Sequence, residues 1–170
     1  MVLIMSENPR RHFLKEKEAK QLLDEFSQRF NVDTERLLGS KPHIELVKAQ
    51  VAETFIINGK PLLARFRGAL LPTLIFYDLF TFLPKILVNM GAVPHICNGA
   101  DVMAPGVVRI DGEFNKNDTI LIVDERHGKP LAVGVALLDS QVMKTLKQGK
   151  VAKNIHYVGD GLWNCIKTLV

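Results

Sequence analysis

Two glycines, Gly91 and Gly99, enclose a segment with room for about one and a half turns of helix. Pro94 suits the first turn of such a helix, because its missing N–H would have no helical partner there. Gly99 falls where a left-handed C-terminal cap would end the helix. The chain is therefore constrained to a short helix followed by a turn at this point.

The stretch after this helix carries few bulky side chains. Residues 100–106 read Ala-Asp-Val-Met-Ala-Pro-Gly, with Asp101 as the one charged side chain. A backbone this bare can approach another polymer closely, and its N–H groups can meet phosphate oxygens. The alternative is a tight turn that needs glycine only to pack. These residues alone leave both interpretations open.

Gly91-Ala92 and residues 99–106 resemble the signature of the PUA domain, a small RNA-binding β-barrel. Residues 131–136, Leu-Ala-Val-Gly-Val-Ala, are similar to the strand in which PUA domains carry an Ala-Val-Gly core. The resemblance implies that RNA lies between the glycine loop and the C-terminal strands, near the region from His156 to Gly159. The RNA-binding residues implied in this way are Gly99, Ala100, Asp101, Val102, Met103, Ala104, Pro105, Gly106 and Tyr157.

The end of the chain narrows the resemblance. Residues 157–163, Tyr-Val-Gly-Asp-Gly-Leu-Trp, resemble the C-terminus of the malignant T-cell-amplified sequence family, the translation-machinery-associated PUA proteins. Gly68, residues 71–74 and Leu83-Pro84 fit the N-terminal domain of that family. One departure concerns Asn89-Met90, where the family commonly has Asp and a basic residue. A phosphate contact expected from that basic position is missing.

The charge of the chain sets weaker limits on its partners. The net charge is +4 and the pI about 9.1, a mild basic bias that is compatible with nucleic acid. Up to Pro84 the chain has 12 Lys and Arg against 10 Asp and Glu, and beyond it 10 against 8. Each half is therefore +2, so an RNA site must come from the local placement of charge.

Cysteine usage and the start of the chain indicate the compartment. Neither Cys97 nor Cys165 has neighbours at zinc-ligand spacing, apart from His95. We expect two reduced thiols, no metal and no cofactor. The apolar residues 1–5 are too short for a signal peptide or a membrane span, so we expect a cytoplasmic protein without a membrane partner.

The first domain is predicted over residues 1–84, as a main helix on a small antiparallel sheet. Apolar residues at helical spacing predict the helix over 15–30. Residues 43–67 change period and predict three strands, with a hairpin at Asn58-Gly59. Further elements are a short strand at 10–14, a helical turn at 34–38 and a helix at 73–80. We expect Phe76, Tyr77 and Phe80 to fill the seam between domains, as core and not as a base-stacking platform.

The second domain is predicted over residues 85–170, as a mostly β PUA barrel. A helix is expected over 140–147, with Asp139 as N-cap and Gly149 as its end. Residues 161–163 are expected to close the sheet. The other predicted strands are 85–88, 107–110, 119–124, 130–138 and 155–157. The fold class is therefore α+β, a small N-terminal α/β-sheet domain followed by a C-terminal PUA β-barrel.

Catalytic chemistry has little support. Residues 124–127, Asp-Glu-Arg-His, sit at a predicted hairpin tip, where no pocket shifts a pKa or excludes water. Ser140 and Cys97 lack a recognisable base partner, and no phosphate-binding loop or dinucleotide motif is present. We expect no enzyme activity.

A lysine run offers a second candidate for RNA contact. Lys144, Lys147, Lys150 and Lys153 recur every third residue along the predicted helix and the loop after it. Alone, such a run is typical of solvated surface. The PUA resemblance makes it a candidate phosphate-binding face.

The resemblance implies a non-catalytic translation factor. It would bind the rRNA of the small ribosomal subunit and the acceptor arm of tRNA, in reinitiation or recycling, with a density-regulated-protein-like partner. One alternative is an accessory subunit that targets tRNA or rRNA for modification. Another is a protein–protein adaptor without RNA affinity.

Overall fold

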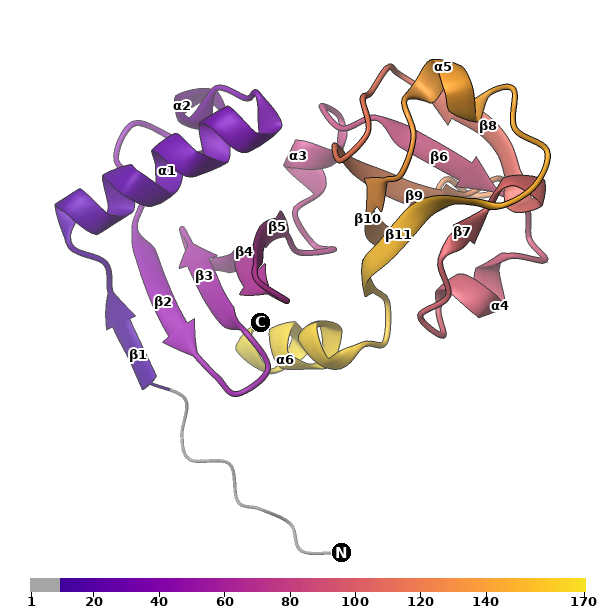
Figure 1. Ribbon diagram of the computed structural model, residues 1–170. Coiled ribbons are helices and arrows are strands. Elements are labelled where there is room, and N and C mark those ends of the chain that lie inside the picture. Colours follow the sequence, from indigo (N-terminus) through magenta and orange to yellow (C-terminus); the bar gives the residue numbers. More distant parts are fainter. Residues whose placement is uncertain (1–9) are drawn as a thin grey trace, which may run out of the picture.

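The computed structural model describes residues 10–170, so the apolar start at residues 1–5 lies outside the described residues. Figure 1 shows two lobes, each built on one sheet. The strands of the first sheet, sheet A, follow one another in chain order and all pair antiparallel. They are β1 (Arg10–Phe13), β2 (Ile44–Lys48), β3 (Glu53–Ile57), β4 (Lys60–Phe66) and β5 (Ala69–Pro72).

Helix α1 (Glu16–Phe30) covers one face of sheet A and confirms the predicted amphipathic helix. Its buried residues, Leu22, Phe26 and Phe30, recur every fourth position, which places them on one face. The short helix α2 (Thr34–Leu38) follows, capped by the Asp33 side chain. The short strand predicted at 10–14 is β1, at one edge of sheet A, and the three predicted strands are β2, β3 and β4. The fifth strand, β5, was not predicted and forms the other edge.

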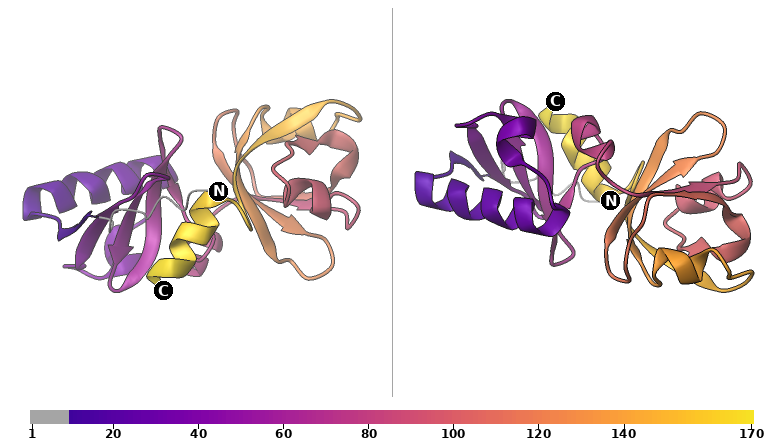
Figure 2. Two further views of the ribbon diagram at one scale, coloured as in Figure 1. Left: turned by 90° about the horizontal axis from the view of Figure 1, so that it is seen from below. Right: turned by 90° about the horizontal axis from the view of Figure 1, so that it is seen from above.

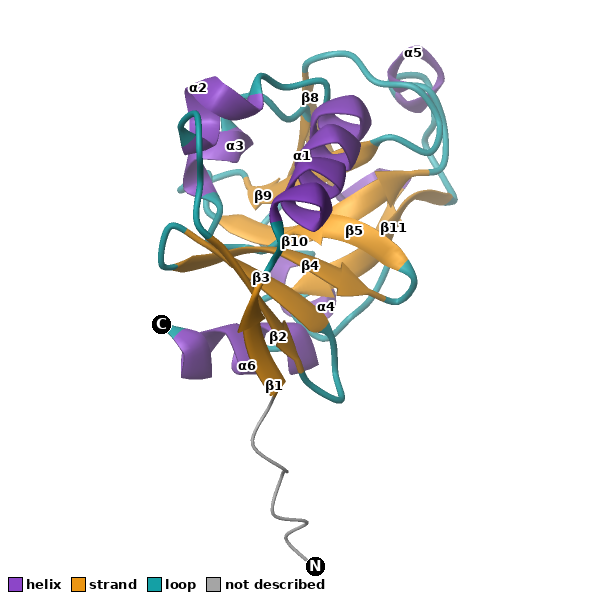
Figure 3. Ribbon diagram, turned by 90° about the vertical axis from the view of Figure 1, so that its left-hand side faces the viewer, coloured by secondary structure: helices purple, strands orange, loops and turns teal. Residues whose placement is uncertain are grey.

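The opposite face of sheet A is covered by helix α6 (Gly161–Leu169), as Figure 3 shows. The prediction that residues 161–163 close the barrel is therefore wrong. The Asp160 side chain accepts a hydrogen bond from the Trp163 N–H and caps the helix. Leu162 and Ile166, one helical turn apart, pack on Ala64 and Phe66. The end of the chain thus returns to the first lobe.

The second sheet, sheet B, curls on itself in the second lobe and confirms the α+β class (Figure 2). Its strand order is β7-β11-β10-β9-β6-β8, antiparallel except for the parallel pair β6–β9. The strands are β6 (Lys85–Val88), β7 (Val102–Met103), β8 (Val107–Asp111), β9 (Thr119–Asp124), β10 (Pro130–Ala136) and β11 (Lys150–Tyr157). The short helices are α3 (Tyr77–Phe80), α4 (Val93–Ile96), η1 (Ala104–Gly106) and α5 (Ser140–Met143).

Two predictions in this lobe need correction. Helix α5 ends at Met143, four residues before the predicted end, and the Asp139 side chain does not cap it. Asp139 instead accepts a hydrogen bond from the Lys116 N–H, which ties it to the neighbouring loop. Strand β11 begins at Lys150 and not at Ile155, because Gly149, with φ +93°, turns the chain directly into it.

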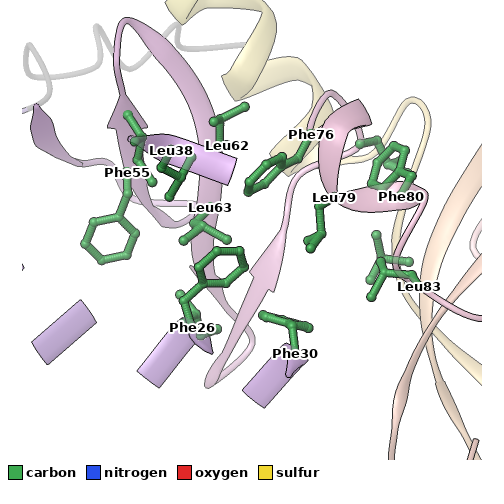
Figure 4. Close-up of a cluster of buried hydrophobic side chains, with 14 of the residues drawn as sticks. Phe26, Phe30, Leu38, Phe55, Leu62, Leu63, Phe76, Leu79, Phe80 and Leu83 are labelled. Atoms are coloured by element: carbon green, nitrogen blue, oxygen red, sulfur yellow. The ribbon is translucent and has the colours of Figure 1, made fainter. Parts of the chain in front are cut away.

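The two lobes share apolar packing along their seam. Phe76, Leu79 and Phe80 are buried in a cluster that reaches from α1 and sheet A to strands of sheet B. The close-up in Figure 4 shows these three residues beside Phe26 and Phe30 of α1. The members contributed by sheet B are Leu87, Leu121, Val123 and Val133. Tyr77 does not join them, because its side chain is 61% exposed on the outer side of α3. The prediction for Phe76 and Phe80 is confirmed, and that for Tyr77 is wrong.

Candidate nucleic-acid interface

The turn after α4 is built as a left-handed helix cap. Gly99 has a φ of +92°. Its N–H donates to the Ile96 carbonyl at 3.0 Å, and the Ala100 N–H donates to the His95 carbonyl at 3.0 Å. This pair of bonds is the Schellman arrangement. The Gly99 and Ala100 donors therefore serve the helix end and are not free for phosphate, which corrects the expectation from sequence.

Gly99 is also required by its neighbour on β11. A Cβ atom at position 99 would lie 3.1 Å from the Tyr157 hydroxyl oxygen and 3.2 Å from Cε1 of that ring. The Tyr157 side chain therefore supports the loop from beneath. Both the positive φ and the close approach demand glycine, so the packing explanation of this residue is sufficient.

A buried asparagine holds the loop in place. The Asn154 side chain is 4% exposed and donates to the carbonyls of Ile96 and Ala100, each at 3.0 Å. The Asn154 N–H donates to Asp101 Oδ1 at 2.9 Å, and Lys150 Nζ lies 3.3 Å from Asp101 Oδ2. Asp101 is thus bound to β11 and does not face outward as a free charge. Sequence reasoning missed Asn154, because nothing local marks it as the partner of a loop some fifty residues earlier.

The loop borders a cavity of about 420 Å³. One wall of the cavity is formed by α4 and the residues before it, and the other by the stretch from Ala100 to Gly106, which includes β7 and η1. Both walls are mostly apolar. Its polar side chains are those of Asn89, His95 and Asp101. The Asn89 carboxamide oxygen accepts from the Ala92 N–H at 2.9 Å, so it orients the entry into α4. An apolar pocket with a few polar groups is typical of a binding site for a small group such as a nucleotide base.

The predicted loop residues divide by exposure. Ala100, Met103 and Pro105 are exposed, whereas Val102 and Ala104 are buried in the barrel core. Gly106 is partly buried and lies on the cavity wall, where a Cβ atom would meet that of Ala92 at 3.3 Å. The surface available to a ligand is therefore narrower than the stretch 99–106.

The four lysines do not share one face. Lys144 lies at the end of α5, which Figure 1 places at the other end of the barrel from α4. Lys147 is exposed in the turn before Gly149, whose carbonyl accepts from the Ala104 N–H at 2.8 Å. Lys150 is beside Asp101, and Lys153 lines a separate crevice toward the first lobe. Lys147 and Lys150 therefore lie on the side of the loop, whereas Lys144 and Lys153 point elsewhere.

The candidate catalytic groups are structural. Asp124 is 3% exposed and accepts hydrogen bonds from the N–H groups of Arg126, His127 and Lys129. Those bonds, led by that from His127, hold the pKa of Asp124 below its usual value. Burial raises the pKa of the Cys97 and Cys165 thiols, which makes them poor nucleophiles. Within residues 10–170 no group of His, Cys, Asp and Glu side chains is arranged to hold a metal ion.

His156, which the resemblance placed near RNA, is fully buried. Its Nε2 accepts from the Leu74 N–H at 3.3 Å, and its Nδ1 lies 2.9 Å from Asp160 Oδ2. Because Nε2 is the acceptor, Nδ1 carries the proton and donates to Asp160. The pair joins the two lobes and has no open side for a ligand.

None of the helices in residues 10–170 is both long and apolar enough to span a membrane. The PUA domain family matches residues 84–158, and a domain of unknown function (DUF1947) matches residues 10–77. The PUA match covers the second lobe. The DUF1947 match covers the first lobe, whose domain family has no assigned function.

Relatives span nearly the whole chain. An uncharacterized protein of Methanocaldococcus jannaschii is 36% identical over 159 residues, 91% of this chain and 96% of the relative. Malignant T-cell-amplified sequence 1 of Danio rerio is 30% identical, over 85% of this chain and 82% of the relative. Translation machinery-associated protein 20 of Saccharomyces cerevisiae is 26% identical, over 76% of each.

Two solved structures share this arrangement. A hypothetical protein of Pyrococcus horikoshii superposes with a TM-score of 0.78 at 34% identity, over 92% of this chain and 99% of that chain. A PUA domain protein of Aeropyrum pernix, solved as a tartrate complex, gives a TM-score of 0.82 at 26% identity, over 94% and 91%.

Proposed function

The chain belongs to the family of malignant T-cell-amplified sequence 1 and translation machinery-associated protein 20, and on this premise we propose that it is a non-catalytic RNA-binding protein of the translation machinery. The observation that carries the proposal is the exposed Ala100 on a rigid loop beside the 420 Å³ cavity. The loop is fixed by Asn154 and Tyr157, so its shape is set before any ligand binds. Such preorganisation lowers the cost of binding.

The finer role follows from the family alone. We infer that the RNA is the acceptor arm of tRNA or rRNA of the small ribosomal subunit, in reinitiation or recycling, and that the protein acts in the cytoplasm. A density-regulated-protein-like partner would belong to the same assembly. These statements rest on the relatives associated with the translation machinery.

The loop is tested by Ala100→Glu, which adds bulk and a negative charge where RNA would lie. We expect RNA affinity to fall at least about tenfold, or ~1.4 kcal/mol. Because Ala100 is exposed and only its backbone makes contacts, the melting temperature should hardly change. Asn164→Glu, on the exposed side of α6, is the control for one added negative charge. A folded Ala100→Glu protein that binds RNA as tightly as the control would remove the loop from the site.

The same titrations separate RNA binding from a pure adaptor role. Counterion release makes log K fall with log salt by ~0.7 to 0.9 per phosphate neutralised. A protein–protein adaptor would show no such slope with any RNA.

A further inference from the structure

A second cavity, of about 120 Å³, lies in the crevice between the two lobes. Its charged lining residues are Arg29, Arg67 and Lys153, and no carboxylate lines it. We call this cavity, with these three cations, the seam crevice. It is separate from the loop cavity, with which it shares no lining residue.

Each cation of the seam crevice comes from a different element. Arg29 is in the last turn of α1, Arg67 is in the turn between β4 and β5, and Lys153 is on β11. The site exists only when the two lobes are packed together. Sequence reasoning marked Lys153 alone, because Arg29 and Arg67 are brought to it by folding.

None of the three cations has an ion-pair partner within the part of the chain that the structure describes. All three are exposed, and none takes part in an ion pair of residues 10–170. Glu25, one turn before Arg29 on α1, forms its ion pair with Arg65, which binds both of its oxygens at 3.0 and 2.6 Å, and the charge of Arg29 acts on Glu25 only as a smaller contribution to its lowered pKa. Three cations around one crevice that no carboxylate lines favour binding of an anion.

The two guanidinium groups are also oriented. Arg29 Cζ lies 5.9 Å from the centroid of the Phe30 ring, and Arg67 Cζ lies 5.0 Å from that of Phe66. Both rings are 8% exposed and therefore fixed in the core. A guanidinium held over a fixed ring is restrained by cation–π attraction, and its planar fork of donors matches the oxygens of a phosphate group.

We propose that the seam crevice is a second phosphate-binding site, in which Arg29, Arg67 and Lys153 hold the sugar–phosphate backbone of RNA. The argument for RNA rests on the proposed function and on β11. Lys150 beside the loop and Lys153 in the crevice are three residues apart on that strand, ~10 Å in an extended chain. Because side chains three residues apart on a strand point to opposite faces, an RNA strand contacts both sites only if it crosses the edge of sheet B, and both lobes then bind a single ligand.

Two measurements test this, with a crevice variant (Arg29→Gln, Arg67→Gln and Lys153→Gln) and a control variant (Lys17→Gln, Lys60→Gln and Lys116→Gln). The control removes the same charge at exposed positions outside the crevice. The first measurement is a tripolyphosphate titration followed by the backbone amide NMR signals of Gly68 and Gly134. We expect these signals to shift in the parent and in the control, and to stay in place in the crevice variant.

The second measurement is the salt dependence of binding to a single-stranded RNA of twenty nucleotides. Losing three phosphate contacts should flatten the slope of log K against log salt by ~2 units in the crevice variant and leave it unchanged in the control. If the Gly68 and Gly134 signals of the parent do not shift when tripolyphosphate is added, the seam crevice is not a phosphate-binding site. This holds whatever the salt dependence of RNA binding is. Tripolyphosphate binding with equal RNA slopes in both variants overturns its role toward RNA. Ala100→Glu should keep the tripolyphosphate shifts, so a failure of the loop site is recognised separately.

Discussion

Within the C-terminal signature, residues 157–163, Asp160 is the residue that holds the local structure together through hydrogen bonds. Its carboxylate accepts from His156 Nδ1, from the Tyr157 N–H at 3.0 Å and from the Trp163 N–H at 2.7 Å. Through His156 it also fixes the acceptor for the Leu74 N–H of the other lobe. The motif that identified the family from sequence is thus a joint between lobes. Sequence reasoning assigned its neighbourhood to RNA because burial of His156 leaves no trace in the residues around it.

Asp160→Asn tests this joint through its pH dependence. Burial raises the pKa of Asp160, but the hydrogen bonds that its carboxylate accepts from His156 and from the Trp163 and Tyr157 N–H groups outweigh burial, so the pKa is lowered. Loss of charge-assisted hydrogen bonds should lower the free energy of unfolding by roughly 2–3 kcal/mol at pH 7. Urea unfolding followed by Trp163 fluorescence measures this difference.

The sign of the pH effect follows from the lowered pKa. The stability that the carboxylate contributes is complete above its unfolded pKa, ~3.9, and is lost as the pH falls through the lower folded value. The gap between the parent and Asp160→Asn should therefore begin to shrink below about pH 4. A gap that widens between pH 5 and pH 3 would contradict the ionised carboxylate.

Helix α6 is the element that sequence reasoning assigned wrongly. Gly161-Leu162-Trp163 is a short apolar run, and such runs do not distinguish a strand from a buried helix. The helical signals were present, with Asp160 as N-cap and Leu162 and Ile166 four residues apart. The longer elements were predictable because α1 has four turns of amphipathic pattern and Asn58-Gly59 fixes its hairpin, with φ of +50° and +84°.

Ile166→Ala tests how much α6 contributes. Ile166 is fully buried against sheet A, so its truncation should lower the free energy of unfolding by about 2–5 kcal/mol. Asn164→Ala, exposed on the same helix, should stay within ~0.5 kcal/mol. Chemical denaturation read by the single tryptophan, Trp163, reports on α6 directly. Equal effects of the two substitutions would show that α6 adds nothing to the fold.

At the scale of the whole molecule, the order of most elements was predictable and the packing between them was not. Local signals predicted the two lobes, the short helix before Gly99 and a barrel, and the family resemblance predicted that this barrel is a PUA domain. The loop's partner Asn154, the Leu74–His156 bond and the three cations of the seam crevice depend on contacts between residues far apart in sequence. A single sequence carries no signal for such pairs. The loop of the candidate site was therefore predicted, and the residues that hold it in place were not. The boundary at Pro84 stays a prediction.

The last prediction is that the lobes depend on each other for stability. The apolar cluster at the seam continues from Leu74 and Phe76 into Leu121 and Val133, and α6 of the second half covers sheet A of the first. Separating the chain after Pro84 would expose both surfaces, and fragments with such patches associate or aggregate. We expect the intact chain to unfold in one calorimetric transition with equal calorimetric and van't Hoff enthalpies.

The two fragments 1–84 and 85–170, expressed separately, complete the test. Each alone should aggregate or unfold without cooperativity, and mixing should restore a complex that sediments as the intact chain does. The fragment 85–170 carries Leu162 and Ile166 without their partners Ala64 and Phe66, so it should bind an apolar dye until 1–84 is added. A monomeric, cooperatively folded 1–84 fragment that ignores the other half would mean that the shared cluster contributes little to either lobe.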